Sequence, residues 1–353
     1  MPAMALSMKP TGWFQIGWSD EIAVGDVVPL KFFGRELVAY RTEGGGLVVL
    51  NAYCEHLGAN MAFGGTVHGN DIQCPFHGWR WGPNGRNTCI PYQDGVNRVR
   101  RIGTWSTAER DGIMYLWHDL GKSAPAYDVP SVFELFADSG PAERYHPADA
   151  DSRIRSGDLA VHPQYVIENG VDFAHFKYVH RADEMPEVTR RSFDEHEFHT
   201  SLALKFKTKN ADGEYEMVQG GVDATTLGIG LGYSYAWGVG EICSVTAVTP
   251  IDDETSALWF TSWANKEAGE AESRLLRRKH SAVAQFKADL AIWEHQRYTE
   301  PPGLATAEAA GFRDIRRWAR RFYPEGEAGH GDAEQQAATD AGASADLGFE
   351  VAR

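Results

Sequence analysis

The sequence predicts an α+β protein, in which a small all-β domain precedes a larger domain with an antiparallel sheet and a long helix near the C-terminal end. Three observations support this prediction. The first third of the chain alternates short β-branched and aromatic runs with closely spaced glycines, which is typical of strands joined by tight turns. Several alternating runs follow in the second half, and residues 270–298 form the longest stretch of helix-forming residues.

The first domain is expected to span residues 12–120. Its clearest hairpin joins residues 36–41 (ELVAYR) to residues 47–52 (LVVLNA) through a glycine-rich turn. A further strand at residues 112–119 (GIMYLWHD) closes the domain. Short strands and tight turns of this kind predict a small module without helices.

The second domain is expected to span residues 121–323, and residues 121–150 begin it as a proline-containing linker. The strands predicted for its sheet are residues 191–207, 215–222, 227–237, 242–249 and 257–264. Residues 324–353 are rich in Gly, Ala, Glu, Asp and Gln, so we expect a flexible tail.

Three segments of the second domain predict helix. Residues 164–180 have helical character in part, and residues 270–298 form the long helix, which Pro301 and Pro302 should stop. A second short helix is predicted at residues 312–323. Strands followed by a long helix fit an α+β domain.

Composition limits the functional classes. The chain has 353 residues and a formal net charge of −15, and 43% of its residues are hydrophobic, so it can bury a substantial core. The acidic balance, with no basic run, argues against a nucleic-acid partner. No apolar stretch is long enough to span a membrane, and residues 1–12 do not read as a secretory signal. With only four cysteines, we expect a cytoplasmic protein with reduced thiols.

Two cysteines and two histidines form a metal-ligand pattern. Cys54-x-His56 is followed, after 17 intervening residues, by Cys74-x-x-His77. Two thiolates and two imidazoles suit either a structural zinc or a [2Fe–2S] cluster with two Cys on one iron and two His on the other. A zinc-binding interaction module would be colourless, which distinguishes the two interpretations.

The sequences CEHLGAN and CPFHGWRW around these ligands resemble the Rieske signature. High-potential Rieske proteins carry two further cysteines, and Ala59 and Phe76 stand in the matching places here. Trp79 stands where those proteins have a serine that donates to the cluster, which implies a lower potential, as in the oxygenase and ferredoxin branch. Cys89 and Cys243 lie outside the motif and are expected to be free and buried.

A second constellation lies in the segment ENGVDFAHFKYVH, residues 168–180. His175 and His180 with a nearby carboxylate suit a non-haem Fe(II) site with open positions for O₂ and substrate. The pattern Glu-Asn-x-x-Asp-x-x-His-x4-His, downstream of a Rieske motif, resembles the α subunit of Rieske non-haem iron oxygenases over residues 12–300. This resemblance implies a helix-grip-like catalytic domain and makes His175 and His180 iron ligands.

In that family the third iron ligand is an aspartate on the long C-terminal helix, which implies Asp289 here. Asp252 and Asp253 are weaker candidates because they fall in a predicted turn. Glu294 is also weaker, since five residues along a helix place it on a different side from Asp289.

The resemblance also assigns roles to Asp172 and Asn169. It implies that Asp172 bridges a cluster-ligand histidine, His56 or His77, of one subunit to an iron-ligand histidine of the next. Asn169 matches a residue near the iron, and whether it binds the metal stays open. Transfer between neighbouring subunits implies a head-to-tail ring, usually a homotrimer.

Several pieces, including CPFHGWRW and DLAIWEHQRY, resemble the oxygenase component of 3-ketosteroid 9α-hydroxylase and related steroid-type Rieske monooxygenases. This implies hydroxylation of a C–H bond in a bulky apolar substrate, most simply a 3-ketosteroid, with O₂. A separate flavin/iron–sulfur reductase or ferredoxin would supply the electrons. Gly228-x-Gly230-x-Gly232 does not fit a dinucleotide fingerprint and is predicted to be a strand in close contact with a neighbour.

Other functions stay open. An O-demethylase of methoxy-aromatic acids would need a buried cation near the iron, and Lys177 is close in sequence. Sterol desaturases share similar motifs, and an electron carrier with a vestigial iron site would show the cluster without turnover. The apolar runs 227–237 and 257–263 could line a large flat pocket or simply pack the core.

Overall fold

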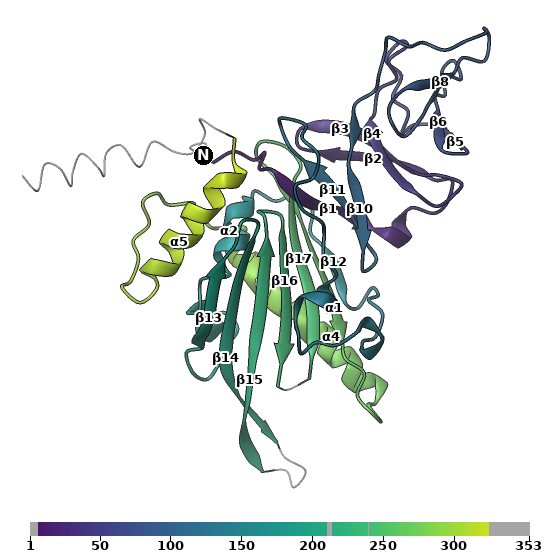
Figure 1. Cartoon of the computed structure of the whole chain (residues 1–353). Coiled ribbons are helices and arrows are strands. Elements are labelled where there is room, and N and C mark those ends of the chain that lie inside the picture. The colour runs from purple at the N-terminus through teal and green to yellow at the C-terminus, as the bar shows by residue number, and fades with distance from the viewer. Residues whose placement is uncertain (1–5, 210–213, 239, 325–353) are drawn as a thin grey trace, which may run out of the picture.

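The computed structural model describes residues 6–209, 214–238 and 240–324. The predicted tail at residues 325–353 therefore lies outside the described residues. Small antiparallel sheets of the first part of the chain lie beside a large antiparallel sheet that a long helix crosses on one face (Figure 1). The α+β fold class and the order of its parts are as predicted.

Three small sheets make up the first part. A three-stranded sheet has the order β1-β11-β10, with β1 (Gly12–Trp18), β11 (Ile113–His118) and β10 (Thr107–Arg110). A second sheet contains β2 (Val27–Phe32), β3 (Arg35–Arg41), β4 (Leu47–Asn51) and β9 (Thr104–Trp105). The third contains β5 (Thr66–His68), β6 (Asp71–Gln73), β7 (Arg80–Trp81) and β8 (Asn87–Cys89). The predicted hairpin is the pair β3 and β4.

The large sheet has seven strands in the order β12-β18-β17-β16-β15-β14-β13. Their bounds are β12 (Arg153–Arg155), β13 (Glu187–Phe193), β14 (Glu197–Lys209), β15 (Tyr215–Leu227), β16 (Leu231–Trp237), β17 (Ile242–Pro250) and β18 (Ser256–Ala264). The α-helices are α1 (Val132–Leu135), α2 (Pro163–Glu168), α3 (His175–Tyr178), α4 (Glu272–Trp293) and α5 (Ala309–Ala319). Short 3₁₀ turns are Ser19–Glu21, Ala142–Arg144 and Arg320–Phe322.

The two faces of this sheet have different neighbours. One face, which we call the domain face, packs against β1 and β11 in one continuous core. Trp18 meets Trp259 edge to face at 5.1 Å and donates from Nε1 to Oγ1 of Thr261 at 2.9 Å. The opposite face, the helix face, packs Leu258 and Phe260 against α4. Side chains alternate between the faces along each strand.

Tertiary contacts shift several predicted boundaries. The run 191–207 is divided by a turn, because the backbone N–H of Asp194 bonds Glu197 O and reverses the chain between β13 and β14. The long helix ends at Trp293 rather than near residue 298, where Tyr298 instead stacks on Tyr165. The short helix starts earlier than predicted, at Ala309.

Two further interpretations need correction. Residues 228–230 form the turn between β15 and β16 rather than a strand. The expected close approach is present, since a Cβ on Gly230 would lie 2.4 Å from the carbonyl oxygen of Trp13.

Residues 121–150 are not a free linker, because Val132, Phe136 and Tyr145 are buried in the core shared with the first part. Within the described ranges, no helix is long and apolar enough to cross a membrane.

Candidate functional site

The cysteine–histidine motif folds as two loops with the same backbone pattern. In the first loop, the N–H of Gly58 bonds the carbonyl of Cys54 at 2.9 Å, and in the second Gly78 bonds Cys74 at 3.1 Å. Both glycines have positive φ, 77° and 71°, which a side chain would strain. The repeated turn places one cysteine and one histidine on each loop, as the sequence pattern requires.

The cysteines and the histidines of these loops differ in their exposure to solvent. Cys54 and Cys74 are buried, whereas His56 and His77 are half-exposed with ring centroids 4.7 Å apart. Burial raises the pKa of the Cys54 thiol to about 11, although Nε1 of Trp81 donates to its sulfur at 3.3 Å. The Nδ1 atom of His77 is buried and has no hydrogen-bond partner among the described residues, as a metal-binding nitrogen would be without its metal. The four residues therefore fit a cluster with its histidine side toward the surface.

The second predicted site gathers residues from distant parts of the chain. The nearest ligand atoms of His175, His180 and Asp289 lie within 4.8 Å of one another. His180 Nε2 is 3.2 Å from Asp289 Oδ1, and the two imidazole centroids are 4.9 Å apart. Two ligand atoms bound at about 2.1 Å on adjacent positions of one metal are about 3 Å apart, so this spacing fits a shared ion.

A hydrogen bond fixes which nitrogen His175 presents. His175 Nδ1 bonds the carbonyl oxygen of Asp172, which leaves Nε2 toward the other two residues. Burial lowers the pKa of His175, although Asp289 and Asp172 oppose this effect. A neutral imidazole is the form that binds a metal. Nδ1 of His180 is buried and unpartnered within the described part of the chain.

Asp172 and Asn169 both lie beside His175. Asp172 Oδ1 accepts the backbone N–H groups of Ala174 at 3.1 Å and of His175 at 3.2 Å, so it orders the start of α3. Its side chain remains half-exposed. Asn169 caps α2, and its Nδ2 lies 3.3 Å from Nε2 of His175. The structure thus places both residues next to an iron-ligand candidate.

A buried ion pair supports this segment and was missed in the sequence. Arg316 of α5 bonds both oxygens of Glu168, at 2.8 and 2.9 Å, in the bidentate geometry that guanidinium favours. Gln164 also donates to Glu168, at 2.9 Å. Arg316 is about 150 residues away in sequence, so only the docking of α5 reveals the pair.

The weaker metal candidates lie elsewhere. Asp252 accepts from Thr255 in the turn between β17 and β18, and Asp253 pairs with Lys9 at 2.6 Å. Glu294 caps the end of α4 and is exposed, as is Lys177. The cysteines outside the motif are free as expected, but only Cys243 is buried, since Cys89 is half-buried at the end of β8.

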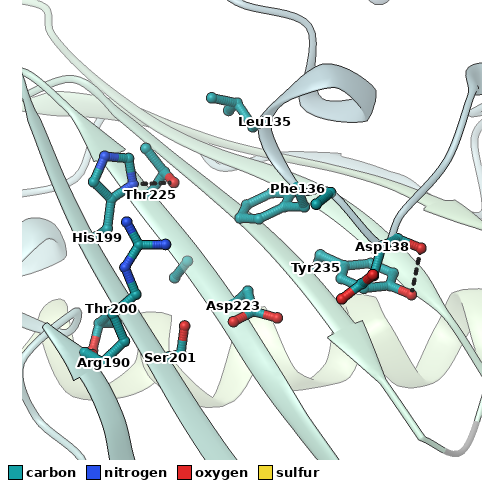
Figure 2. A pocket seen from close by; sticks show the side chains of 12 residues that line it. Leu135, Phe136, Asp138, Arg190, His199, Thr200, Ser201, Asp223, Thr225 and Tyr235 are labelled. Carbon is teal, nitrogen blue, oxygen red and sulfur yellow. Dashed lines mark hydrogen bonds between the residues drawn. The ribbon is translucent and has the colours of Figure 1, made fainter.

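A cavity of about 190 Å³ lies on the domain face of the sheet, opposite to the face that packs on α4 (Figure 2). Arg190, His199, Asp223 and Tyr235 line it, so it is polar. None of the predicted metal ligands lies in it. Most side chains of 227–237 and 257–263 on this face pack in the core instead of lining a flat pocket.

Two consecutive parts of the chain match two known families. Residues 12–100 match the Rieske [2Fe-2S] domain, and residues 116–323 match the 3-Ketosteroid 9alpha-hydroxylase C-terminal domain. The oxygenase component of 3-ketosteroid-9-alpha-monooxygenase from Rhodococcus rhodochrous is 28% identical over 326 residues, 88% of this chain and 79% of the relative. Cholesterol 7-desaturase from Bombyx mori is 28% identical over 333 residues, 90% of this chain and 70% of the relative.

Solved structures share the fold at lower identity. Dicamba monooxygenase bound to dicamba superposes with a TM-score of 0.68 and 17% identity, covering 95% of this chain and 99% of that one. NdmA from Pseudomonas putida CBB5 with caffeine superposes with a TM-score of 0.65 and 16% identity. The match covers 87% of this chain and 89% of that one. Both chains therefore share the fold of this chain over most of its length.

Proposed function

Since this chain belongs to the Rieske oxygenases that carry the 3-ketosteroid 9alpha-hydroxylase C-terminal domain, we propose that it is the terminal oxygenase of a steroid-type monooxygenase system. It would hydroxylate a C–H bond of a bulky apolar substrate, most simply a 3-ketosteroid. The second substrate is O₂, and a separate NAD(P)H-dependent reductase or ferredoxin provides electrons. We also propose residues 12–120 and 121–323 as the two functional domains.

His175, His180 and Asp289 are proposed to hold a mononuclear iron, and Cys54, His56, Cys74 and His77 the [2Fe–2S] cluster. When bound, the iron supplies O₂ activation with electrons that the cluster delivers one at a time. Three protein ligands leave open positions for O₂ and substrate. The Asp172 carbonyl holds the orientation of the His175 imidazole, and Asp289 compensates the charge of the site.

The observation that carries the substrate class is the uneven burial of β16. Leu231, Tyr233 and Tyr235 are buried on the domain face, whereas Gly232, Ser234 and Ala236 between them are half-exposed on the helix face. A central strand of a covered sheet is normally buried on both faces. The small side chains therefore leave room between this strand and α4.

The same face is uncharged around that room. Its side chains on β15 and β17 nearest to β16 include Val222, Ala224, Ser244 and Thr246. From β14 to β18, Glu216 is the one Asp, Glu, Lys or Arg that alternates onto this face among the described residues, and it is exposed near the start of β15, eight residues before Ala224. A neutral surface built from small side chains suits a rigid apolar ring system better than a small anion.

One observation favours the O-demethylase alternative. Arg191 of the edge strand β13 pairs in register with Thr200, which places it on the helix face. Its guanidinium lies against Gly311 of α5, and its Nε is buried without a partner in the described part of the chain. A methoxy-aromatic carboxylate would need such a cation.

A product assay by mass separates the two functions. Holoprotein, a compatible reductase and NADH are incubated with androst-4-ene-type 3-ketosteroids and, separately, with methoxybenzoates. We expect a one-oxygen gain on the steroid. Loss of a methyl group from the benzoate, with steroids unchanged, would refute the steroid proposal and leave both metal sites standing. Loss of two hydrogens from a sterol would instead indicate a desaturase.

Filling the proposed substrate face gives a sharper test. Ala224→Leu is expected to lower kcat/KM for the steroid by about tenfold or more, since an added side chain in a fitted site costs about 1–3 kcal/mol. Ala224→Ser keeps the size and should behave like the parent chain. If both variants turn over alike, the substrate does not lie on this face.

The oligomer is proposed as a head-to-tail homotrimer. In one chain, the strands β5–β8 beside the cluster loops lie at the far end of the molecule from α2, which leads into the iron-ligand segment (Figure 1). Asp172 is half-exposed, and its Oδ2 makes no hydrogen bond with the described residues. It is therefore proposed to meet His77 or His56 of a second copy, so that the electron passes between subunits.

A further inference from the structure

Arginines are concentrated in the segment that contains the cluster loops. We name as the arginine edge the residues Arg80, Arg86, Arg98, Arg100 and Arg101. Residues 52–103 contain these five cations against three carboxylates, whereas the whole chain has net charge −15. All but Arg80 are exposed. This segment thus has a net positive charge in a chain that is acidic as a whole.

Two contacts place the arginine edge beside the cluster ligands. Arg100 Nη1 lies 3.6 Å from Oε2 of Glu55, which stands between Cys54 and His56 in the chain. Arg80 Nε donates at 3.1 Å to Oε1 of Gln73, the residue that directly precedes Cys74 in the chain. Both ligand loops therefore carry an arginine at their side.

Aromatic rings connect this edge with a cluster ligand. Trp79 stacks on His56 with centroids 4.3 Å apart and planes within 4°. Nε1 of this buried indole donates at 2.6 Å to the hydroxyl of Tyr92, which is 60% exposed. Val99, between Arg98 and Arg100, is 90% exposed. Apolar groups ringed by charge are typical of interaction sites.

We propose that the arginine edge is the docking surface for an acidic electron-carrier protein, which reduces the cluster from its His56 side. This rests on the proposed function, which requires electrons from a separate protein. In each encounter one electron leaves the carrier, which is oxidised, and enters the diferric cluster, which becomes mixed-valent; no bond is formed or broken. Opposite charges steer such an encounter and raise its rate at low salt. His77 stays available to a second copy of the chain.

The test uses holoprotein and an acidic plant-type [2Fe–2S] ferredoxin with its NADPH-dependent reductase. Arg98→Glu combined with Arg100→Gln reverses the charge without placing a carboxylate beside Glu55. The matched control, Arg313→Glu with Arg277→Gln, changes two exposed arginines on α5 and α4 by the same total charge. Binding to immobilised ferredoxin and the rate of cluster reduction by absorbance are measured from low to high salt.

We expect the test variant to bind about tenfold or more weakly and to be reduced more slowly at low salt, with the difference shrinking as salt rises. The control should stay within about twofold of the parent. Reduction by photoreduced deazariboflavin, a small neutral donor, should be the same for all proteins. None of these readouts involves substrate or the mononuclear iron, so they stay valid if the steroid proposal fails.

Three outcomes would overturn the proposal. Equal weakening of test and control variants would show a general charge effect. A loss that does not change with salt would exclude electrostatic docking. A change in sedimentation of the test variant alone, with unchanged ferredoxin binding, would show that the edge contacts a second copy of the chain instead.

Discussion

The two proposed metal sites of this chain are built in opposite ways. The cluster ligands come from two short loops within residues 54–77, each closed by its own backbone hydrogen bonds. The iron candidates come from α3, the residues after it, and α4, so that more than 100 residues separate His180 from Asp289. The first site is local chain geometry, whereas the second exists only after the helices have packed on the sheet. The two should therefore fail independently when the chain is altered.

The largest expected effect tests that independence. Asp289→Ala removes the one carboxylate of the triad, so we expect loss of the mononuclear iron and a fall in turnover of about a thousandfold or more. Cluster absorbance should stay unchanged, because no cluster ligand is touched. Metal analysis and EPR measure both sites in one sample.

Glu294→Ala and Asp253→Ala are the matched controls, since each removes a carboxylate that the sequence also offered. Both should retain iron and turnover. Iron loss in either control, with iron retained in Asp289→Ala, would refute the proposed ligand set.

Asp172→Asn addresses the link between the sites. The substitution keeps the side-chain oxygen that accepts the N–H groups of Ala174 and His175, but removes the charge. We expect both metal sites to remain and steady-state turnover to fall about 10- to 100-fold, because the carboxylate no longer joins two imidazoles. The cluster should still be reduced by its carrier at the parent rate.

Rapid mixing of reduced Asp172→Asn with O₂ and substrate would locate the defect at cluster oxidation. Sedimentation should show a trimer for the parent chain. A monomeric parent with full turnover would contradict transfer between subunits.

The contrast between the sites also explains how much could be predicted from the sequence. Cys54, His56, Cys74 and His77 lie in a fixed local spacing, so their grouping could be read directly. Asp289 could be reached only through a family resemblance, because no local pattern distinguishes it from other helix acids. The division of residues 191–207 depends on a turn, and the early end of α4 accompanies the stacking of Tyr298 on Tyr165. The periodicity of hydrophobic residues reports neither feature.

The ion pair of Arg316 with Glu168 could be predicted neither from the sequence pattern nor from the family resemblance. Arg316→Met breaks a buried bidentate pair and leaves Glu168 without its cation, which is expected to lower the free energy of unfolding by about 3–5 kcal/mol. Arg317→Met, on the same helix, removes an exposed partner of Asp314 at 3.7 Å and should cost about 1 kcal/mol or less.

Urea unfolding of both variants, with iron content measured alongside, checks this prediction. Because Glu168 precedes Asn169 and the iron segment, Arg316→Met should also weaken iron retention while the cluster is kept. Equal stabilities for the two variants would show that the pair contributes little.

The last expected effect is a pH dependence of stability that both regions share. His118 of β11 and His162 before α2 are buried, and each bonds a carbonyl of the N-terminal segment, Pro10 O at 2.7 Å and Ser7 O at 3.1 Å. Burial lowers the pKa of each imidazole from 6.5 to about 4. Between these values the unfolded chain binds more protons than the folded chain. The stability that each of these neutral imidazoles contributes is therefore fully present above about pH 6.5. As pH falls toward 4, this contribution of about 3 kcal/mol for each residue is lost.

His162→Gln tests this linkage in the catalytic region. In the parent, Nδ1 of His162 accepts the N–H of Gln164 and caps α2, so protonation there breaks the cap. The stability difference between parent and variant should shrink as pH falls from about 7 to about 4.5. Since parent and variant are compared at the same pH, acid effects on the metal sites cancel. A constant difference for His162→Gln would mean that folding does not change the pKa of this imidazole.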